Sequence, residues 1–243
     1  MKILIAFYLL WVGTASARAQ QPSFSLGPRV GLNAATYHSA QLHDYETQGY
    51  RVGLEAGLAS TVNFGHLGLQ AAVLYAQRGA TLHADIEFNS GSGTGNKGTY
   101  DASSRLNCVT MPLALAYNQR TDGQGAQLFA GPYFSLLLNG HYDNTLTSPS
   151  GGATSRSGAI TPVNDEALDL ATHPVPAYRR RFDAGLQGGL GYRYHALLFQ
   201  ASYSLGLQNA MASFTYNGAP VNHPASYNRA FQASLSYLFG LTR

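Results

Sequence analysis

Eight stretches of this chain alternate between large apolar residues and small or polar ones. In residues 182–194, for example, Phe182, Leu186 and Leu190 fall on one face, and Asp183 and Gln187 share the other with several glycines. A repeat of two residues is the period of a β-strand. The stretches are residues 23–33, 50–62, 67–78, 107–117, 127–138, 182–194, 198–207 and 230–239. No helical pattern of comparable quality competes with them, so the sequence predicts an all-β fold.

The two faces of these strands indicate which side meets which solvent. Leu, Val, Phe and Tyr occupy one face, whereas the charges Arg29, Glu55 and Asp183 lie on the other among glycines and small residues. In hydrocarbon every backbone polar group must be paired, so a sheet there has to close into a barrel. Eight strands enclose an interior that side chains can fill. We therefore expect an apolar outside and a packed polar lumen whose glycines make room.

The connections between the strands alternate in length. Short turns follow the second, fourth and sixth strands, while residues 34–49, 79–104, 139–180 and 209–228 are long and rich in Gly, Ser, Asn, Thr and Pro, and are predicted to be loops. Short turns on one side and long loops on the other are typical of bacterial outer-membrane barrels. The prediction is an eight-stranded antiparallel up-and-down transmembrane β-barrel with large surface loops and both termini in the periplasm. Aromatic residues concentrate at the strand ends, where two membrane interfaces would lie.

The N-terminal segment has the pattern of a cleaved signal peptide. Lys2 precedes an apolar run from Ile3 to Val12, and Ala17-Arg18-Ala19 provides small residues for cleavage. The run is too short for a spanning helix, which needs about 20 apolar residues. The expected organisation is a signal peptide over residues 1–19 and one outer-membrane barrel domain over residues 20–243.

Charge and cysteine content exclude some classes of partner. Without Lys2 and Arg18 the 15 Lys and Arg become 13, against 12 Asp and Glu. The remaining balance is close to neutral, so no nucleic-acid partner is expected. The single Cys108 cannot form an internal disulfide, and on an inward face it is interpreted as a packing residue.

Four segments resemble the PorT-like outer-membrane β-barrel domain family, a porin-like family of Bacteroidota. They are VTMPLALAY, LFAGPYFSLLL, FDAGLQGGLGYRY and the closing FQASLSYLFG. The resemblance implies an integral outer-membrane barrel that the barrel assembly machinery inserts, and it says little about activity. The chain departs from many outer-membrane proteins at its end, where GLTR follows Phe239 in place of a terminal aromatic residue. Pro28, Pro112 and Pro132 fall inside strands, and we expect bulges at the last two because proline removes a ladder donor.

Charged residues on the inward face suggest a structural ion pair in the lumen. Arg29 and Glu55 lie on adjacent strands at similar height, so they are expected to pair and to block the lumen. Asp183 begins nearer the outer end, where Arg51 or Arg181 would be its partner. With eight strands, such a lumen is expected not to conduct solutes freely.

Arginines also gather where strands meet the outer surface. Parity places Arg105, Arg180 and Arg229 outward, where guanidinium groups could pair with lipopolysaccharide phosphates. Arg51, Arg78 and Arg181 would face the lumen mouth. Outer-membrane lipid and lipopolysaccharide are therefore the expected partners, and the sequence does not identify what the surface loops bind.

No catalytic, metal or cofactor site is predicted. His38, His43, His83, His141, His173 and His223 fall in the predicted loops without ligand spacing, and no nucleophile motif is present. The preferred function is a non-enzymatic barrel with a surface-binding, structural or assembly role. A small pore, an enzyme with a loop-borne site and a soluble lipocalin-like binder remain alternatives. The last would reverse the two faces and put the apolar residues inside.

Overall fold

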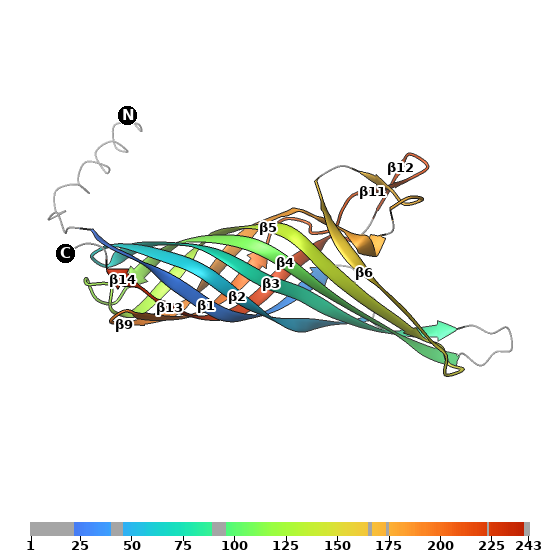
Figure 1. Ribbon diagram of the computed structural model, residues 1–243, viewed down its shortest axis with the longest axis horizontal. Coiled ribbons are helices and arrows are strands. Elements are labelled where there is room, and N and C mark those ends of the chain that lie inside the picture. The colour runs from blue at the N-terminus through green and yellow to red at the C-terminus, as the bar shows by residue number, and fades with distance from the viewer. Residues whose placement is uncertain are drawn as a thin grey trace, which may run out of the picture.

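A computed structural model describes residues 22–39, 46–88, 96–164, 167–173, 175–222 and 224–240. The predicted signal peptide lies outside the described residues, as do His43 and His223. Long antiparallel strands dominate the structure (Figure 1). Among the described residues, no helix has the length and apolar character needed to cross a membrane.

Eight strands form a closed ring. Each pairs with the next along the chain, and the last pairs with the first, in the order β1, β2, β3, β4, β5, β9, β10 and β13. The fold is an eight-stranded antiparallel β-barrel, as the sequence predicts. The bounds are β1 Ser23–Ser39, β2 Glu46–Phe64, β3 Leu67–Phe88, β4 Asn96–Asn118, β5 Gly125–Thr147, β9 Phe182–Tyr194, β10 Leu197–Gly206 and β13 Ser226–Tyr237.

The barrel closes along a continuous ladder between its first and last strands. Arg29 to Ser39 of β1 pair with Ser236 to Ser226 of β13. The two-residue strand β14 (Phe239–Gly240) continues this ladder to Ser25 of β1. The first and last described residues therefore lie at the same end of the barrel as the short turns that follow β2, β4 and β9 (Figure 1).

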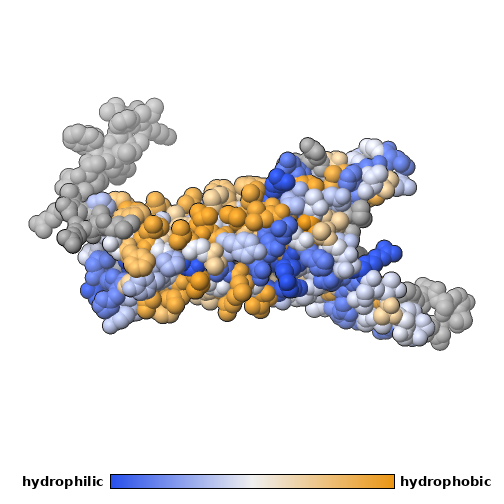
Figure 2. Space-filling view, in the orientation of Figure 1, coloured by the Kyte–Doolittle hydropathy of each residue, from blue (hydrophilic) through white to orange (hydrophobic). Residues whose placement is uncertain are grey.

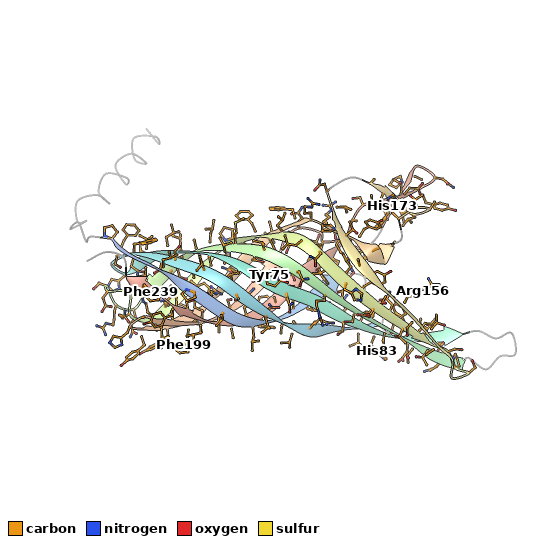
Figure 3. The ribbon with its side chains drawn as sticks, viewed as in Figure 1. Tyr75, His83, Arg156, His173, Phe199 and Phe239 are labelled. Atoms are coloured by element: carbon orange, nitrogen blue, oxygen red, sulfur yellow. The ribbon has the colours of Figure 1, made fainter. Side chains whose placement is uncertain are left out.

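The outside of the barrel is apolar over a broad band (Figure 2). Many of the outward side chains are half or more exposed, which is unusual for large apolar groups in a water-soluble monomer. Exposed aromatic residues such as Phe199 and Phe239 lie near the end that carries the termini (Figure 3). The exposed apolar set includes Val30, Leu54, Leu58, Val73, Leu115, Leu128, Leu190 and Phe231.

Glycine on the inward face is required by close backbone approach as well as by lumen volume. A Cβ on Gly57 would lie 2.0 Å from the carbonyl oxygen of Val73, and one on Gly53 would lie 1.9 Å from that of Gln77. The nearest atoms belong to the backbone of the neighbouring strand, which cannot rotate away as a side chain can. These two positions therefore allow β2 and β3 to pack closely while the sheet coils tightly.

The prediction that residues 79–104 and 139–180 form loops is wrong for much of their length. β3, β4 and β5 continue beyond the ring and pair with one another out to Phe88, Asn96 and Thr147, and β6 (Ala153–Val163) joins β5. We call residues 80–88, 96–104, 140–147 and 153–163 the wing. It extends from one end of the barrel as an open sheet (Figure 1). The pairs of β5 with β9 end at Leu136, so above that point β6 takes the place of β9.

Short elements lie over the same end of the barrel. β7 (Leu168–Asp169), β11 (Phe214–Tyr216) and β12 (Ala219–Val221) form a separate three-stranded sheet. The 3-10 helix η1 (Val175–Ala177) leads into β8 (Tyr178–Arg180), which runs parallel to the end of β6. β8 also bridges to the segment between β10 and β11 through Arg179 and Met211. β8 therefore lies across the mouth and is not part of the barrel wall.

The expected bulges at Pro112 and Pro132 are absent from the described ladders. The ladder between β4 and β5 passes from Pro112↔Tyr133 to Leu115↔Ala130 with the same register, although the pairs between them are missing. The shift in register occurs higher, between Asn107 and Cys108. The sheet thus accommodates these prolines by omitting pairs and not by inserting a residue.

Candidate functional site

A chain of polar side chains crosses the middle of the lumen. Arg29 Nη2 lies 3.3 Å from Glu55 Oε1, and Arg29 Nη1 donates to Gln200 Oε1 at 3.2 Å. Gln200 Nε2 then donates to Gln70 Oε1 at 2.9 Å, and Gln70 Nε2 donates to Gln127 Oε1 at 2.5 Å. The five residues come from β2, β1, β10, β3 and β5, so one network ties most of the wall together through the interior.

Arg193 forms a second polar layer nearer the short turns. Its Nη2 donates to Ser25 Oγ at 3.0 Å, its Nη1 to Thr61 Oγ1 at 3.4 Å and its Nε to the carbonyl oxygen of His195 at 3.2 Å. The two-residue alternation of residues 182–194 puts Arg193 on the same face as Asp183, but it identifies no partner for it. Its three acceptors lie on β1, on β2 and in the turn after β9, and pattern reasoning does not bring these together.

Apolar side chains fill part of the remaining lumen. Leu74, Leu198 and Leu238 form a buried cluster with two alanines, and Phe129 packs with two others. Cavities along the barrel are small: one of about 20 Å³ lies beside Arg29 and Gln200, and one of about 30 Å³ lies near the outer mouth. A single water needs roughly 10–15 Å³ by this kind of measure. These spaces therefore have room for one or a few waters each.

Asp183 is at the centre of the upper lumen, with partners other than those expected. Neither Arg51 nor Arg181 pairs with it. Tyr133 Oη donates to Asp183 Oδ2 at 3.0 Å, Asn228 Nδ2 lies 3.4 Å from the same oxygen, and Arg78 Nη1 lies 3.9 Å away. The Arg78 guanidinium also stacks over the ring of Tyr133, 5.2 Å from its centroid.

The rim arginines divide into outward and inward groups. Arg105 is exposed and Arg229 is half-buried beside the outward Phe231, as parity suggests. Arg180 differs from its expected outward position: its Nη2 donates to Ser213 Oγ at 3.2 Å, and its side chain lines the 30 Å³ cavity of the mouth. Arg51 donates to Ser103 Oγ. Arg180 turns inward because β8 is a separate strand whose faces do not continue those of β9.

The outer mouth contains a larger cavity of about 330 Å³, and each of the strands β1 to β5 contributes residues to its lining. Its described lining consists of three tyrosines, several hydroxyl and amide side chains, apolar residues, and one arginine from β8. These residues include Tyr37, Tyr100, Tyr142, Gln48, Thr81, Ser103, Ser104, Asn144, Ile160 and Arg179. Sequence analysis missed this cavity because it treated β8 and the wing as loops.

The histidines do not gather into a metal site in the described part of the chain. That part contains no group of three or more His, Cys, Asp or Glu side chains that could hold a metal ion. His83 and His141 instead lie beside aspartates on the exposed faces of the wing. Cys108 is buried near Leu106, Leu137 and Ile160, where it packs as a small apolar residue.

Several solved outer-membrane proteins are similar in structure at low sequence identity. Ail of Yersinia pestis, solved with the heparin analogue sucrose octasulfate, is 12% identical, with 90% of this chain and 100% of that chain covered and a TM-score of 0.38. Neisserial surface protein A is 10% identical, with 90% of this chain and 100% of that chain covered and a TM-score of 0.37. OprG of Pseudomonas aeruginosa is 10% identical, with 90% of this chain and 95% of that chain covered and a TM-score of 0.31. Scores this low carry no argument about function.

Sequence comparison gives the firmer result. No curated protein matches the chain. The outer membrane protein beta-barrel domain matches residues 18–212, which is well over half of the sequence. The match agrees with the closed ring of eight strands and with its apolar outer surface. The chain belongs to the outer membrane protein beta-barrel domain family.

Proposed function

We propose that this protein is a non-enzymatic outer-membrane barrel that does not conduct solutes and acts through its outer mouth as a surface-binding protein. The observation that carries this proposal is the cross-lumen network from Glu55 through Arg29 to Gln200 and Gln127. A buried network of this kind fixes side chains across the path that an ion would need. The apolar cluster around Leu74 and Leu198 adds a second obstruction.

Conductance of the refolded wild-type protein in a planar lipid bilayer tests this function. Because side chains fill an eight-stranded barrel, we expect no stable channels, whereas open porins use 16 to 18 strands. Stable, large, ohmic channels would overturn the proposal and favour the alternative of a small pore. A porin of known conductance in the same bilayer controls for insertion.

The orientation and origin of the barrel belong to the same proposal. A signal peptide over residues 1–19, periplasmic termini and membership of the PorT-like branch are supported by the N-terminal pattern, by the short turns beside both ends and by the four matching segments. The long strands and the wing would then face the cell exterior. Protease added to whole cells should cut the wing and leave the residues beside the short turns intact; the reverse pattern contradicts this orientation.

Arg105 and Arg229 remain the outward arginines that we propose contact lipopolysaccharide phosphates. Both lie on barrel strands, and Arg229 is beside the exposed ring of Phe231. Guanidinium groups bind phosphates through paired hydrogen bonds. Replacing both with Gln should reduce the lipopolysaccharide that co-purifies with the protein. Retention equal to that of the wild type would contradict the contact.

A further inference from the structure

Among the described residues of the outer mouth, two guanidinium groups that are removed from water lie close to only one carboxylate. Arg78 and the half-buried Arg179 line the 30 Å³ cavity, and Asp183 is the one described carboxylate in its lining. Asp183 already accepts hydrogen bonds from Tyr133 and Asn228 and lies 3.9 Å from Arg78. Taking a guanidinium out of water is costly unless an anion pairs with it. The cluster therefore favours a further negative charge.

Arg179 is the arginine whose position points to a ligand. Its guanidinium lies 5.4 Å from the centroid of the Tyr37 ring, and its Nη1 contacts the sulfur of Met211, which is a weak acceptor. Its buried Nε has no hydrogen-bond partner, and no described carboxylate lies within ion-pair distance. Arg78 below it is 4% exposed, and its buried Nε also lacks a partner.

Arg179 and Tyr37 line both cavities of the mouth, so they mark the boundary between them. The inner cavity has room for water or one small ion, whereas the outer one, at about 330 Å³, is at the lower end of the range for small-molecule sites. An anionic group held at Arg179 would leave the rest of its molecule in the outer cavity. That cavity sets the size of the ligand at about that of a monosaccharide.

The outer cavity is lined by groups that suit a body rich in hydroxyl groups. Gln48, Thr81, Ser103 and Asn144 offer neutral hydrogen-bonding side chains from four strands. Three tyrosine rings provide flat faces with a hydroxyl at one end, which bind molecules that are apolar on one side and polar on another. Among the described residues that line this cavity, Arg179 is the one charged side chain.

We propose that the outer mouth binds a small polyhydroxylated organic oxyanion, such as a sugar phosphate, with its charge at Arg179 and its body among the three tyrosines. The site lies in the outer mouth and is lined by polar side chains such as Gln48, Ser103 and Asn144, so it faces water and not the lipid around the barrel. The ligand is thus a free solute, distinct from the lipid-borne phosphates proposed for Arg105 and Arg229. This inference rests on the proposed surface-binding function and specifies its site.

Calorimetric titration of the full-length protein, refolded in detergent, provides the test. Glucose 6-phosphate is expected to bind more tightly than either glucose or inorganic phosphate, because only glucose 6-phosphate has both the negative charge and the sugar ring. Arg179→Gln should weaken its binding about tenfold or more, since a charge-assisted hydrogen bond contributes on the order of 1.5–3 kcal/mol. Arg156→Gln, on an exposed position of the wing (Figure 3), is the matched control and should bind as the wild type does.

Several outcomes would overturn the proposal. If Arg179→Gln and the wild type bind glucose 6-phosphate with equal affinity, Arg179 is not part of the site. If the wild type binds glucose as tightly as glucose 6-phosphate, the site does not recognise the negative charge. Competition by lipopolysaccharide would assign the site to a lipid source. A closed barrel that binds no glucose 6-phosphate would overturn this inference and leave the proposed non-conducting barrel intact.

Stability separates a binding role for Arg179 from a structural one. Without ligand, Arg179→Gln should unfold at the same urea concentration as the wild type or at a higher one, because it removes a half-buried charge that pairs with none of the described carboxylates. If Arg179→Gln unfolds at a lower urea concentration, a second variant separates the two roles. Ala102→Trp fills the outer cavity from β4 and keeps Arg179. Unchanged glucose 6-phosphate affinity in that variant would overturn the site, and lost affinity would support it.

Discussion

The barrel and the wing are continuous strands of one sheet, yet they place their charges in opposite surroundings. In the barrel, Arg29 and Glu55 pair with 9% and 2% of their side chains exposed. In the wing, His83 and Asp101 lie 2.6 Å apart with 51% and 56% exposed. The barrel closes on itself, so its inner face is removed from water, whereas the wing is an open sheet whose visible surface is largely hydrophilic (Figure 2).

This difference teaches that strand pairing alone does not determine how much a polar contact stabilises a sheet. The same β3 and β4 strands run through both regions in one unchanged register. Only closure converts a polar side chain into a buried group that depends on its partner. Side-chain changes should therefore be strongly destabilising in the barrel and weakly so in the wing.

The largest expected effect comes from breaking the lumen pair. Glu55→Ala leaves the buried Arg29 without its carboxylate, and loss of one partner of a buried pair costs about 3–5 kcal/mol. The free energy of unfolding in lipid vesicles, measured by urea titration, should fall by this order. Glu55→Gln should lower the free energy of unfolding by less, because the amide oxygen can still accept a hydrogen bond from Arg29.

Asp143→Ala in the wing is the matched control for this change. Asp143 lies 3.4 Å from His141, and both side chains are more than half exposed. Exposed pairs contribute little because water and salt screen them. A loss of stability as large as that of Glu55→Ala would show that the two regions do not differ as their burial implies.

A smaller effect is expected from adding one methyl group where strands approach closely. In Gly57→Ala the new Cβ would lie 2.0 Å from the Val73 carbonyl oxygen, so the backbone of β2 or β3 must shift. Overpacking of this kind costs about 1–3 kcal/mol. Gly152→Ala beside the wing, where no atom lies within 4 Å of the new Cβ, should leave the unfolding midpoint unchanged. Equal midpoints for the two variants would contradict the close approach.

The two regions were also unequally predictable from sequence, for the same physical reason. Residues 182–194 were predicted as a strand and match β9 at both ends. Lipid outside and a packed lumen inside force large apolar residues to alternate with small or polar ones, and that contrast is readable. The wing extends beyond the apolar band of the barrel and is not placed between lipid and a packed lumen, so residues such as Asp101 and Ser103 carry no such contrast. A weaker alternation of Ala80, Leu82 and Ile86 with polar residues was the one signal of β3 extending into the wing.

The height of a lumen residue along the barrel and its partner there were harder to predict than the face of the strand on which it lies. Parity correctly placed Asp183 inward, but it did not identify Arg78 as the residue beside it. The relative height of two strands depends on every register between them, and the shift at Asn107 and Cys108 lies on the path from β3 to β9. Arg180 was misplaced because parity was extended from β9 across a break into β8, which pairs with β6.

The smallest expected effect concerns the exposed pair in the wing and its dependence on pH. The hydrogen bond that the His83 ring donates to the Asp101 carboxylate raises the pKa of His83 above its usual value of about 6.5, and the charges of Asp101 and Asp85 act in the same direction. A raised folded pKa means that the pair stabilises the wing below pH 6.5 and that this contribution is lost as pH rises through the folded value. Because the barrel does not depend on this pair, its unfolding midpoint should not change over that range. The His83 ring resonances, identified by their absence in His83→Gln, should titrate at higher pH in the wild type than in Asp101→Asn. The same titration midpoint in both proteins would mean that Asp101 does not hold the imidazolium, and the wing would then lack even this weak polar contact.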